Sequence, residues 1–147
     1  MVRIKNRYIV AQLLWNSGPK EKFNEIGVKE LQVLLREKII ELYGDIGAGE
    51  FGNSTLIKYF EAEHSKIMVV KTTRDGEHNV RFALSSMNKV KDVDLCVRSL
   101  TVKSCSRTCN EALKECLRVY FEKAGSKIVD NEQQLAAVYD SLAVVEL

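Results

Sequence analysis

The chain has 147 residues, of which 46% are hydrophobic and 29% charged. This composition is typical of one soluble globular domain and excludes a disordered chain. No apolar run approaches the roughly 20 residues of a membrane span, so we expect no contact with a membrane. The whole chain carries +2 and residues 128–147 carry −4, so residues 1–127 carry +6. A moderately basic domain is compatible with a nucleic-acid partner but does not prove one.

The first element predicted along the chain is a strand. Residues 3–15 are rich in Ile, Val, Tyr and Leu, which favour extended backbone. Arg3, Lys5 and Arg7 alternate at its start, so their charges share one side of the strand and can follow a phosphate backbone. A polar connection over residues 16–27 follows and contains the only proline.

Residues 28–43 predict an amphipathic helix that ends at Gly44. Apolar side chains recur there every three or four positions, and glycine readily adopts the left-handed conformation that closes a helix. The segment GAGEFG at residues 47–52 has the G-x-G-x-x-G spacing of a phosphate-binding loop. It follows a helix and precedes a strand, whereas a dinucleotide-binding loop follows a strand and opens a helix. We therefore interpret it as a connector that lets the backbone turn tightly.

The remaining pattern predicts two strands, a helix, a further strand and two more helices. Residues 54–63 and 65–73 are strand-like and so close together that they predict an antiparallel hairpin. Residues 75–88 have the spacing of a short helix, and residues 93–102 are again strand-like. The last predicted helices cover residues 109–124, between a capping box of Thr108 with Glu111 and a closing Gly125, and residues 131–143.

The order of these elements, β-α-β-β-α-β, predicts an α+β fold of the ferredoxin-like type. In this fold an antiparallel sheet carries helices on one face. The chain would add extra C-terminal helices to that arrangement. Because a ferredoxin-like sheet serves many unrelated functions, the fold alone does not decide what the protein does.

Several functional classes find no support in the sequence. A protein kinase would need catalytic and metal-binding Asp and Asn motifs, which do not follow the glycine segment. A sheet that stacks RNA bases would carry aromatic residues on its central strand, and residues 66–71 contain none. No nucleophile motif, close His–carboxylate pair or metal cluster indicates an enzyme. The cysteines lack C-x-x-C spacing and are interpreted as buried reduced thiols rather than as a zinc site; they are Cys96, Cys105, Cys109 and Cys116.

Basic and hydroxyl side chains gather where the last predicted strand ends and the next helix begins. The group comprises Lys103, Ser106, Arg107 and Thr108. Backbone N–H groups at a helix N-terminus and Arg side chains both bind phosphate oxygens. The alternative is that Ser106 and Thr108 only cap the helix and that Arg107 is solvated. The residues alone leave both interpretations open.

These segments resemble those of a known family. The N-terminal MVRIKNRY, the helix end LYGDIG at residues 42–47 and the strand that leads into Arg107-Thr108-Cys109 are similar to the "processing of precursor five" family. Its members are small RNA-binding protein subunits of ribonuclease P and ribonuclease MRP. The resemblance runs in order over about residues 1–124. The family usually has a glycine-containing run before the arginine, where this chain has Ser104-Cys105-Ser106.

The resemblance implies a ferredoxin-like protein that does no chemistry and braces a catalytic RNA. In the family the RNA, with bound Mg²⁺, removes the 5′ leader of precursor tRNA, and the MRP particle processes precursor rRNA. The protein is expected to bind no cofactor. The implied partners are the catalytic RNA, a TIM-barrel protein subunit of about thirty kilodaltons, other ribonuclease P and MRP proteins, and precursor tRNA as substrate. The expected location is the nucleus and nucleolus, or the cytoplasm if the source is archaeal.

Under this resemblance, residues 1–125 form a single ferredoxin-like RNA-binding domain. Residues 126–147 form an acidic helical extension that packs on the domain or trails it. No residue is expected to be catalytic or to bind a metal. The alternative is a ferredoxin-like regulatory or protein-interaction module without RNA, and salt-dependent RNA binding would separate the two. The residues expected to bind RNA are Arg3, Lys5, Arg7, Lys103, Ser106, Arg107 and Thr108.

Overall fold

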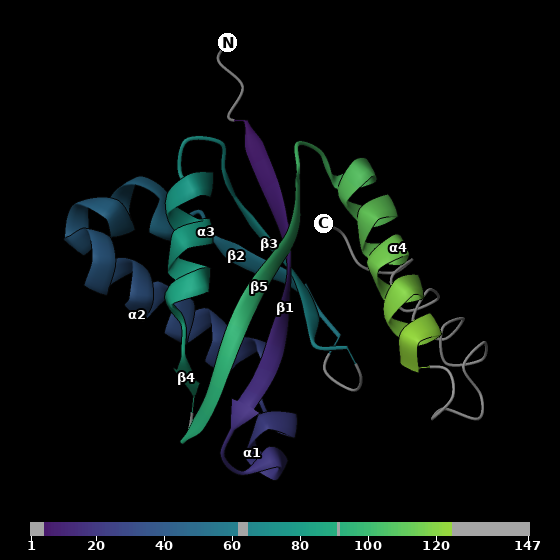
Figure 1. The fold of residues 1–147 in the computed structure, drawn as a ribbon. Helices are drawn as coiled ribbons and strands as arrows, with labels where there is room; N and C mark the ends of the chain where they lie inside the picture. The colour runs from purple at the N-terminus through teal and green to yellow at the C-terminus, as the bar shows by residue number, and fades with distance from the viewer. Residues whose placement is uncertain (1–4, 62–64, 91, 125–147) are drawn as a thin grey trace.

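The computed structural model describes residues 5–61, 65–90 and 92–124. None of the helices in these ranges is long and apolar enough to cross a membrane. The helix expected over residues 131–143 and the extension over residues 126–147 lie outside the described residues. The elements are β1 (Asn6–Ser17), α1 (Lys20–Asn24), α2 (Val28–Gly47), the π-helical turn η1 (Ala48–Gly52), β2 (Leu56–Phe60), β3 (Ile67–Thr73), α3 (Glu77–Ser86), β4 (Lys89–Val90), β5 (Val93–Lys103) and α4 (Ser106–Ala124) (Figure 1).

The strands form one antiparallel sheet with β1 at its centre. The strand order is β2-β3-β1-β5-β4, and β1 pairs antiparallel with both β3 and β5. A ferredoxin-like sheet likewise places its first strand between its third and its last, so the fold expected from the sequence is confirmed. The two-residue strand β4, which the sequence analysis did not predict, pairs with the start of β5.

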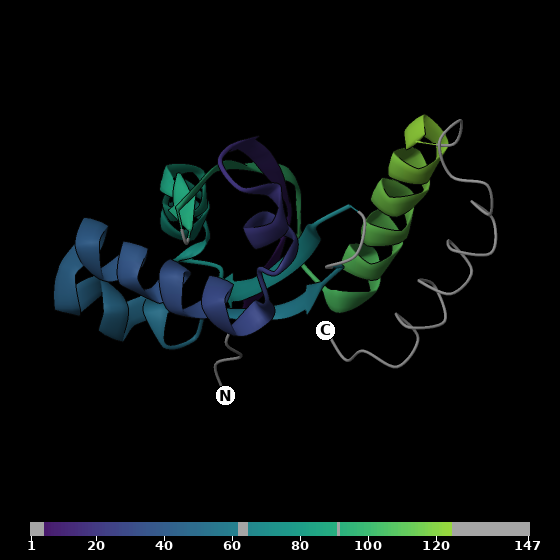
Figure 2. The ribbon, with the colours of Figure 1, turned by 90° about the horizontal axis from the view of Figure 1, so that it is seen from below.

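Alternate side chains of β1 enter two different hydrophobic cores, because successive residues of a strand point to opposite faces. Ile9 and its odd-numbered neighbours join the larger core, under α2 and α3. Tyr8 and Val10 join a smaller core on the other face. Figures 1 and 2 show α2 and α3 on one side of the sheet and α4 on the other. The fully buried residues that α4 contributes to the smaller core are Cys109, Leu113 and Leu117.

The position of α4 adds to the predicted fold. The two helices within the β-α-β-β-α-β order share one face, as expected, and the extra helix α4 covers the opposite face. RNA-recognition modules of this fold stack bases on the open face of the sheet. Here Tyr8 and Tyr59 of that face pack into the core beneath α4. Base stacking at this position is therefore blocked, in agreement with the sequence analysis.

Two glycines set the path from α2 into η1. At Gly44 the backbone has φ +69° and ψ −167°, so the regular helix breaks where the sequence predicted its end. The chain then continues in helical form through η1, and not in the tight turn that we expected. A Cβ atom at Gly47 would lie 2.4 Å from Cβ of Tyr43. The glycine segment is thus a connector packed closely against α2, and its Phe51 lies edge-on to Tyr43 with 5.5 Å between ring centroids.

Differences at the short elements have local causes. The segment expected as a polar connection contains α1, because Phe23 inserts into the larger core. Strand β2 begins at Leu56 and not at residue 54, since the Thr55 hydroxyl donates to the Phe51 carbonyl (2.6 Å) and lies 2.9 Å from the Thr72 hydroxyl. The side-chain amide of Gln32 on α2 then closes the outer edge of β2. It accepts the N–H of Ile57 at 2.8 Å and donates to the carbonyl of Thr55 at 3.0 Å.

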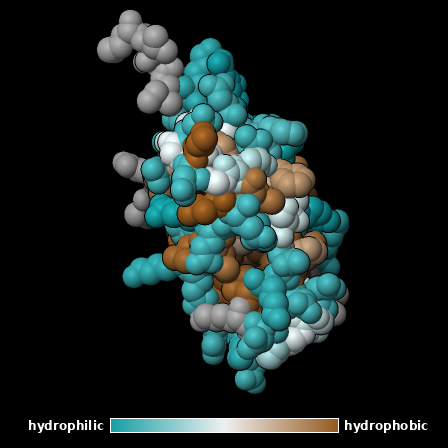
Figure 3. Space-filling view, turned by 90° about the vertical axis from the view of Figure 1, so that its left-hand side faces the viewer, coloured by the Kyte–Doolittle hydropathy of each residue, from teal (hydrophilic) through white to brown (hydrophobic). Residues whose placement is uncertain are grey.

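Some apolar side chains remain exposed on α2 and α3. They include Val33, Ile40 and Phe82, which are 56%, 44% and 55% exposed. Figure 3 shows this side of the molecule, where apolar side chains are set among hydrophilic ones. Scattered exposure such as that of Val33 and Ile40 is normal on a protein surface.

The change Leu113→Ala is expected to lower the free energy of unfolding by about 2–5 kcal/mol, because it opens a cavity in the smaller core at a fully buried position. The matched control is Val33→Ala on the exposed surface of α2, which should cost less than about 0.5 kcal/mol. Urea denaturation followed by circular dichroism measures both changes. Equal effects would show that α4 is not docked on the sheet.

Candidate nucleic-acid interface

Three strand ends and one helix start meet at one end of the sheet. Strand β1 begins there, β3 and β5 end there, and α4 starts just after β5 (Figure 1). The register places Tyr8 opposite Lys71 of β3 and opposite Lys103 of β5. Beyond β1, the backbone N–H of Arg74 donates to the carbonyl of Lys5 over 2.8 Å. We call this region the basic end; its cationic residues are Lys5, Arg7, Lys71, Arg74, Lys103 and Arg107.

Lys71 and Lys103 flank Tyr8 on the α4 side of the sheet, because directly opposed residues of neighbouring strands share a face. Nζ of Lys71 lies 5.8 Å from the centroid of the Tyr8 ring, which is a cation–π distance. Lys103 lies near Cys109, and its positive charge acts to lower the pKa of the Cys109 thiol. Burial raises the pKa of the Tyr8 hydroxyl, and the neighbouring Cys109 and Cys105 raise it further. The Tyr8 hydroxyl therefore stays protonated, and the uncharged side chain lies between two ammonium groups.

Lys5 and Arg7 lie at the start of β1. Lys5 is exposed, and Arg7 is half-buried with its Nη1 donating to the carbonyl of Asn6 over 2.9 Å. Arg7 has the parity of Ile9 and therefore lies on the α3 side of the sheet, whereas Lys103 lies on the α4 side. The basic end thus presents cations on both sides of the sheet end. Arg3 lies outside the described residues, so its place beside Lys5 and Arg7 stays a prediction.

Two arginines of the basic end make ion pairs that solvent weakens. Nε of Arg74 lies 3.5 Å from Oδ1 of Asp75, and both side chains are more than half exposed. Nε of Arg107 lies 3.8 Å from Oε1 of Glu111, with the Arg107 side chain 89% exposed. Exposed pairs of this length contribute little to stability. Both guanidinium groups can therefore exchange their carboxylate for a phosphate.

The N-terminus of α4 differs from the sequence prediction. The helix begins at Ser106, and the N–H of Cys109 donates to the carbonyl of Cys105 over 3.1 Å. The Thr108 hydroxyl donates to the same carbonyl over 3.2 Å, and the Glu111 carboxylate faces Arg107. The predicted capping box of Thr108 with Glu111 was therefore wrong. The chain needs only two residues to turn out of β5, so Cys105 takes the N-cap position three residues before Thr108.

The sequence-predicted residues of this segment nevertheless lie together. Ser106, Arg107 and Thr108 form the exposed first turn of α4, directly after the turn that follows Lys103. The first backbone N–H groups of a helix have no partner within the helix and carry its positive dipole end. The arrangement can therefore bind an anion chemically, although a helix N-terminus alone does not identify one.

Cys105 carries an exposed thiol at the basic end, and its surroundings shift the pKa of that thiol. Its Sγ lies 3.2 Å from the Thr108 hydroxyl, which can turn its single proton from the Cys105 carbonyl to the thiolate. Hydrogen bonds to the thiolate from that hydroxyl and from the backbone of Thr108 and Arg107 lower the pKa of Cys105. Burial instead raises the pKa of Cys109 to about 12, so Cys109 stays a neutral thiol. All four cysteines are free, but Cys96 and Cys105 are exposed. The expectation that all the thiols are buried was therefore wrong for these two.

Two cations of the basic end were missed in the sequence analysis. Lys71 ends the apolar run of β3, and Arg74 follows that strand. Both reach the site through the β1–β3 register, which the apolar pattern does not specify. The signal in the sequence was the lysine that directly follows the apolar residues 67–70. Within the described ranges, no group of three or more His, Cys, Asp or Glu side chains could hold a metal ion.

The chain is similar in sequence and in fold to known proteins. The sequence model of the Rpp14/Pop5 family matches residues 7–114. The chain is 32% identical over 73 residues to "Ribonuclease P/MRP protein subunit POP5" of Schizosaccharomyces pombe, over 44% of this chain and 52% of that protein. The chain thus matches about half the length of this curated relative. A chain in the cryo-EM structure of yeast ribonuclease MRP has a similar fold, with a TM-score of 0.52 at 12% identity over 79% of this chain and 97% of that chain.

We expect Cys105 to react with iodoacetamide faster than Cys96 at neutral pH, because the thiolate is the reactive form and the pKa of Cys105 is lowered. The rate at Cys105 should reach half its maximum below the usual thiol pKa of about 8.5. Thr108→Val removes the hydroxyl and should slow Cys105 while leaving Cys96 unchanged. Timed alkylation with peptide mass spectrometry measures both rates. An unchanged alkylation rate at Cys105 in the Thr108→Val variant would contradict the described hydrogen bond.

Proposed function

Because the chain belongs to the Rpp14/Pop5 family, we propose that it is a non-catalytic protein subunit of ribonuclease P, and also of ribonuclease MRP, that binds and braces the catalytic RNA. The observation that carries the proposal is the convergence of six cations and the N-terminus of α4 at the basic end. An RNA backbone presents a row of phosphates, and cations on both sides of a sheet end can follow such a row.

The proposed division of labour follows from what the side chains of the basic end can do. They can neutralise phosphates and fix the position of an RNA strand. Ammonium and guanidinium groups are not nucleophiles, so they cannot take the part that a metal-bound water plays in hydrolysis. In the proposed particle, the RNA with its own Mg²⁺ removes the 5′ leader of precursor tRNA, and the MRP particle processes precursor rRNA. The protein binds no cofactor and lowers the repulsion between phosphates that the RNA brings together.

The same proposal names the remaining partners and the location. A TIM-barrel protein subunit of about thirty kilodaltons and the other ribonuclease P and MRP proteins would assemble with the chain. The particle would act in the nucleus and nucleolus, or in the cytoplasm of an archaeal source. A ferredoxin-like module without RNA is less favoured, because the basic end would then have no anionic partner.

The triple change Lys5→Ala, Lys103→Ala and Arg107→Ala is expected to weaken RNA binding and its dependence on salt. If each residue contacts one phosphate, the slope of log affinity against log salt should flatten by about 2–3 units. Anisotropy titrations of the labelled ribonuclease P RNA between about 0.05 and 0.5 M KCl would measure the slope.

The matched control removes three cations away from the basic end: Lys29→Ala, Arg36→Ala and Lys89→Ala, which are all exposed. Both triple variants lose the same net charge, so a nonspecific charge effect would flatten both slopes equally. Equal slopes, with normal circular dichroism spectra, would reject the basic end as the RNA-binding surface.

The isolated protein is expected to cleave no precursor tRNA at any Mg²⁺ concentration. It should raise the rate of 5′-leader removal only when it is added to the cognate RNA with the partner proteins. Gel assays of labelled precursor tRNA would measure this rate. Cleavage activity that follows the RNA-free polypeptide through successive purification steps would overturn the non-catalytic role.

A further inference from the structure

The two outer edges of the sheet differ in the hydrogen-bond partners of their backbone. The Gln32 amide closes the edge of β2, as described above. On the opposite edge, β4 pairs only with Val93 and Asp94, and the N–H of Leu95 donates to the carbonyl of Asn88 over 3.0 Å. Beyond Leu95, none of the described strands pairs with the outer side of β5.

The backbone of β5 offers regularly spaced hydrogen-bonding groups along this open stretch. In an antiparallel strand, alternate residues direct both N–H and C=O to the same side. Because the N–H of Leu95 points away from β1, the main-chain groups of Val97 and Ser99 point away from β1 as well. Ser99 lies before the irregularity in the β1–β5 register, so the alternation holds up to this residue. The edge therefore presents two donors and two acceptors in the pattern of a strand partner.

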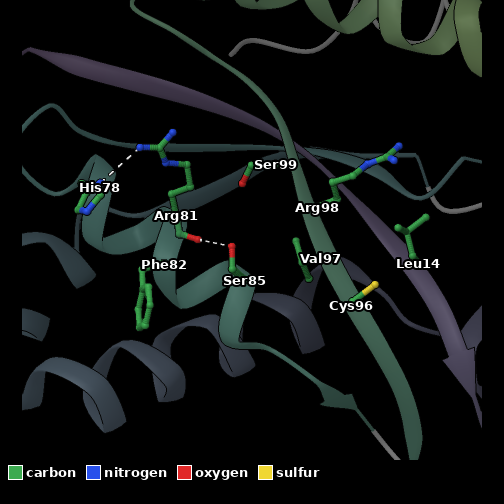
Figure 4. Close-up of a pocket in the computed structure, with 9 residues that line it drawn as sticks. All are labelled: Leu14, His78, Arg81, Phe82, Ser85, Cys96, Val97, Arg98 and Ser99. Atoms are coloured by element: carbon green, nitrogen blue, oxygen red, sulfur yellow. Dashed lines mark hydrogen bonds between the residues drawn. The ribbon is translucent and has the colours of Figure 1, made fainter.

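A hollow of about 630 Å³ surrounds this stretch of β5. Figure 4 shows Val97 and Ser99 on the side of α3, with Cys96 and Arg98 on the other side of the strand. Phe82 of α3 is 55% exposed at this hollow. The hollow thus accepts side chains on both sides of the edge. Its lining residues are Leu14, His78, Arg81, Phe82, Ser85, Cys96, Val97, Arg98 and Ser99.

The charged groups of the hollow are mainly cationic. Arg98 donates through Nη2 to Oε1 of Gln12 over 3.1 Å, and this partner is an uncharged amide. Arg81 pairs with Glu77 on its own helix at 3.2 Å and lies 3.4 Å from Nδ1 of His78. The lining of the hollow therefore contains two guanidinium groups, of which only that of Arg81 has a carboxylate partner among these contacts. An occupant with acidic side chains complements this charge, whereas a second copy of the same edge would bring Arg98 near its own equivalent.

We propose that the open edge of β5 binds an extended, acidic segment of a partner protein by adding it as a further strand. The segment pairs its main chain with Val97 and Ser99. Its side chains alternate between the two faces of the sheet, so acidic residues on one face reach Arg98 and apolar residues on the other face lie against Phe82. An RNA strand lacks the alternating N–H and C=O groups that this edge matches. The site uses no residue of the basic end and does not depend on RNA binding there.

Amide hydrogen exchange on the full chain, read residue by residue by NMR, tests the proposal. The probe is a synthetic peptide of about eight residues that alternates Glu and Val. Without peptide, the amides of Val97 and Ser99 should exchange at least tenfold faster than those of Val69 and Val70 in β3. At saturating peptide, their exchange should slow by about tenfold or more.

Two variants separate the main-chain and charge contributions. Ser99→Pro removes an outward N–H and keeps the inward bonds to β1, and it should abolish peptide binding. Arg98→Glu, at an exposed position, should weaken binding of the Glu–Val peptide at least fivefold and favour a Lys–Val peptide. Arg36→Glu on α2 is the matched control and should change neither affinity.

Several results would overturn the proposal. Val97 and Ser99 amides that are already protected in the free chain would show that the edge is occupied by the chain itself or by a second copy. Peptide binding without protection of these amides would place the contact elsewhere. Protection by a uridine oligonucleotide and not by the peptide would assign the edge to RNA.

Discussion

The central strand β1 is hydrogen-bonded along both edges and covered on both faces, and the other elements are arranged to meet these demands. Ile9, Val10 and Ala11 follow one another in sequence, and each is 0% exposed. Since successive side chains of a strand point in opposite directions, three consecutive buried residues require a layer on each side. Helices α2 and α3 supply one layer and α4 the other. The extra helix is therefore a necessary part of the core.

The same constraint explains why the cations gather where they do. The burial of β1 ends at Tyr8, and the described residues before it, Lys5, Asn6 and Arg7, are polar or charged because they lie beyond both cores. The neighbouring strands are antiparallel to β1, so they finish at the point where β1 begins and place Lys71 and Lys103 beside Tyr8. Helix α4 must cover Tyr8 and Val10, so its first turn with Arg107 starts at the same end. Packing demands alone thus bring charges together from four segments.

The sequence was sufficient for the order of elements and for part of the candidate site. Apolar periodicity identified α2, α3 and α4, and the clustering of basic residues with hydroxyls indicated Lys103 and Arg107. Periodicity could not specify the β1–β3 register, so Lys71 and Arg74 were missed. It also could not choose a face for α4, because an amphipathic helix fits either side of a two-sided strand. The predicted cap was wrong because threonine is a far commoner N-cap residue than cysteine, and Cys105 takes that position here.

The long separation between β1 and β5 has a consequence for the newly made chain. Gln12 and Arg98 are 86 positions apart and meet across the centre of the sheet. At the usual synthesis rate of about 5–20 residues per second, roughly 4–17 s pass between the two residues on the ribosome. During this time β1 is an apolar segment with an unfilled edge, which other chains can pair with. The protein is therefore expected to need shielding by a chaperone until β5 has emerged, and the high contact order of its central strand makes folding slow.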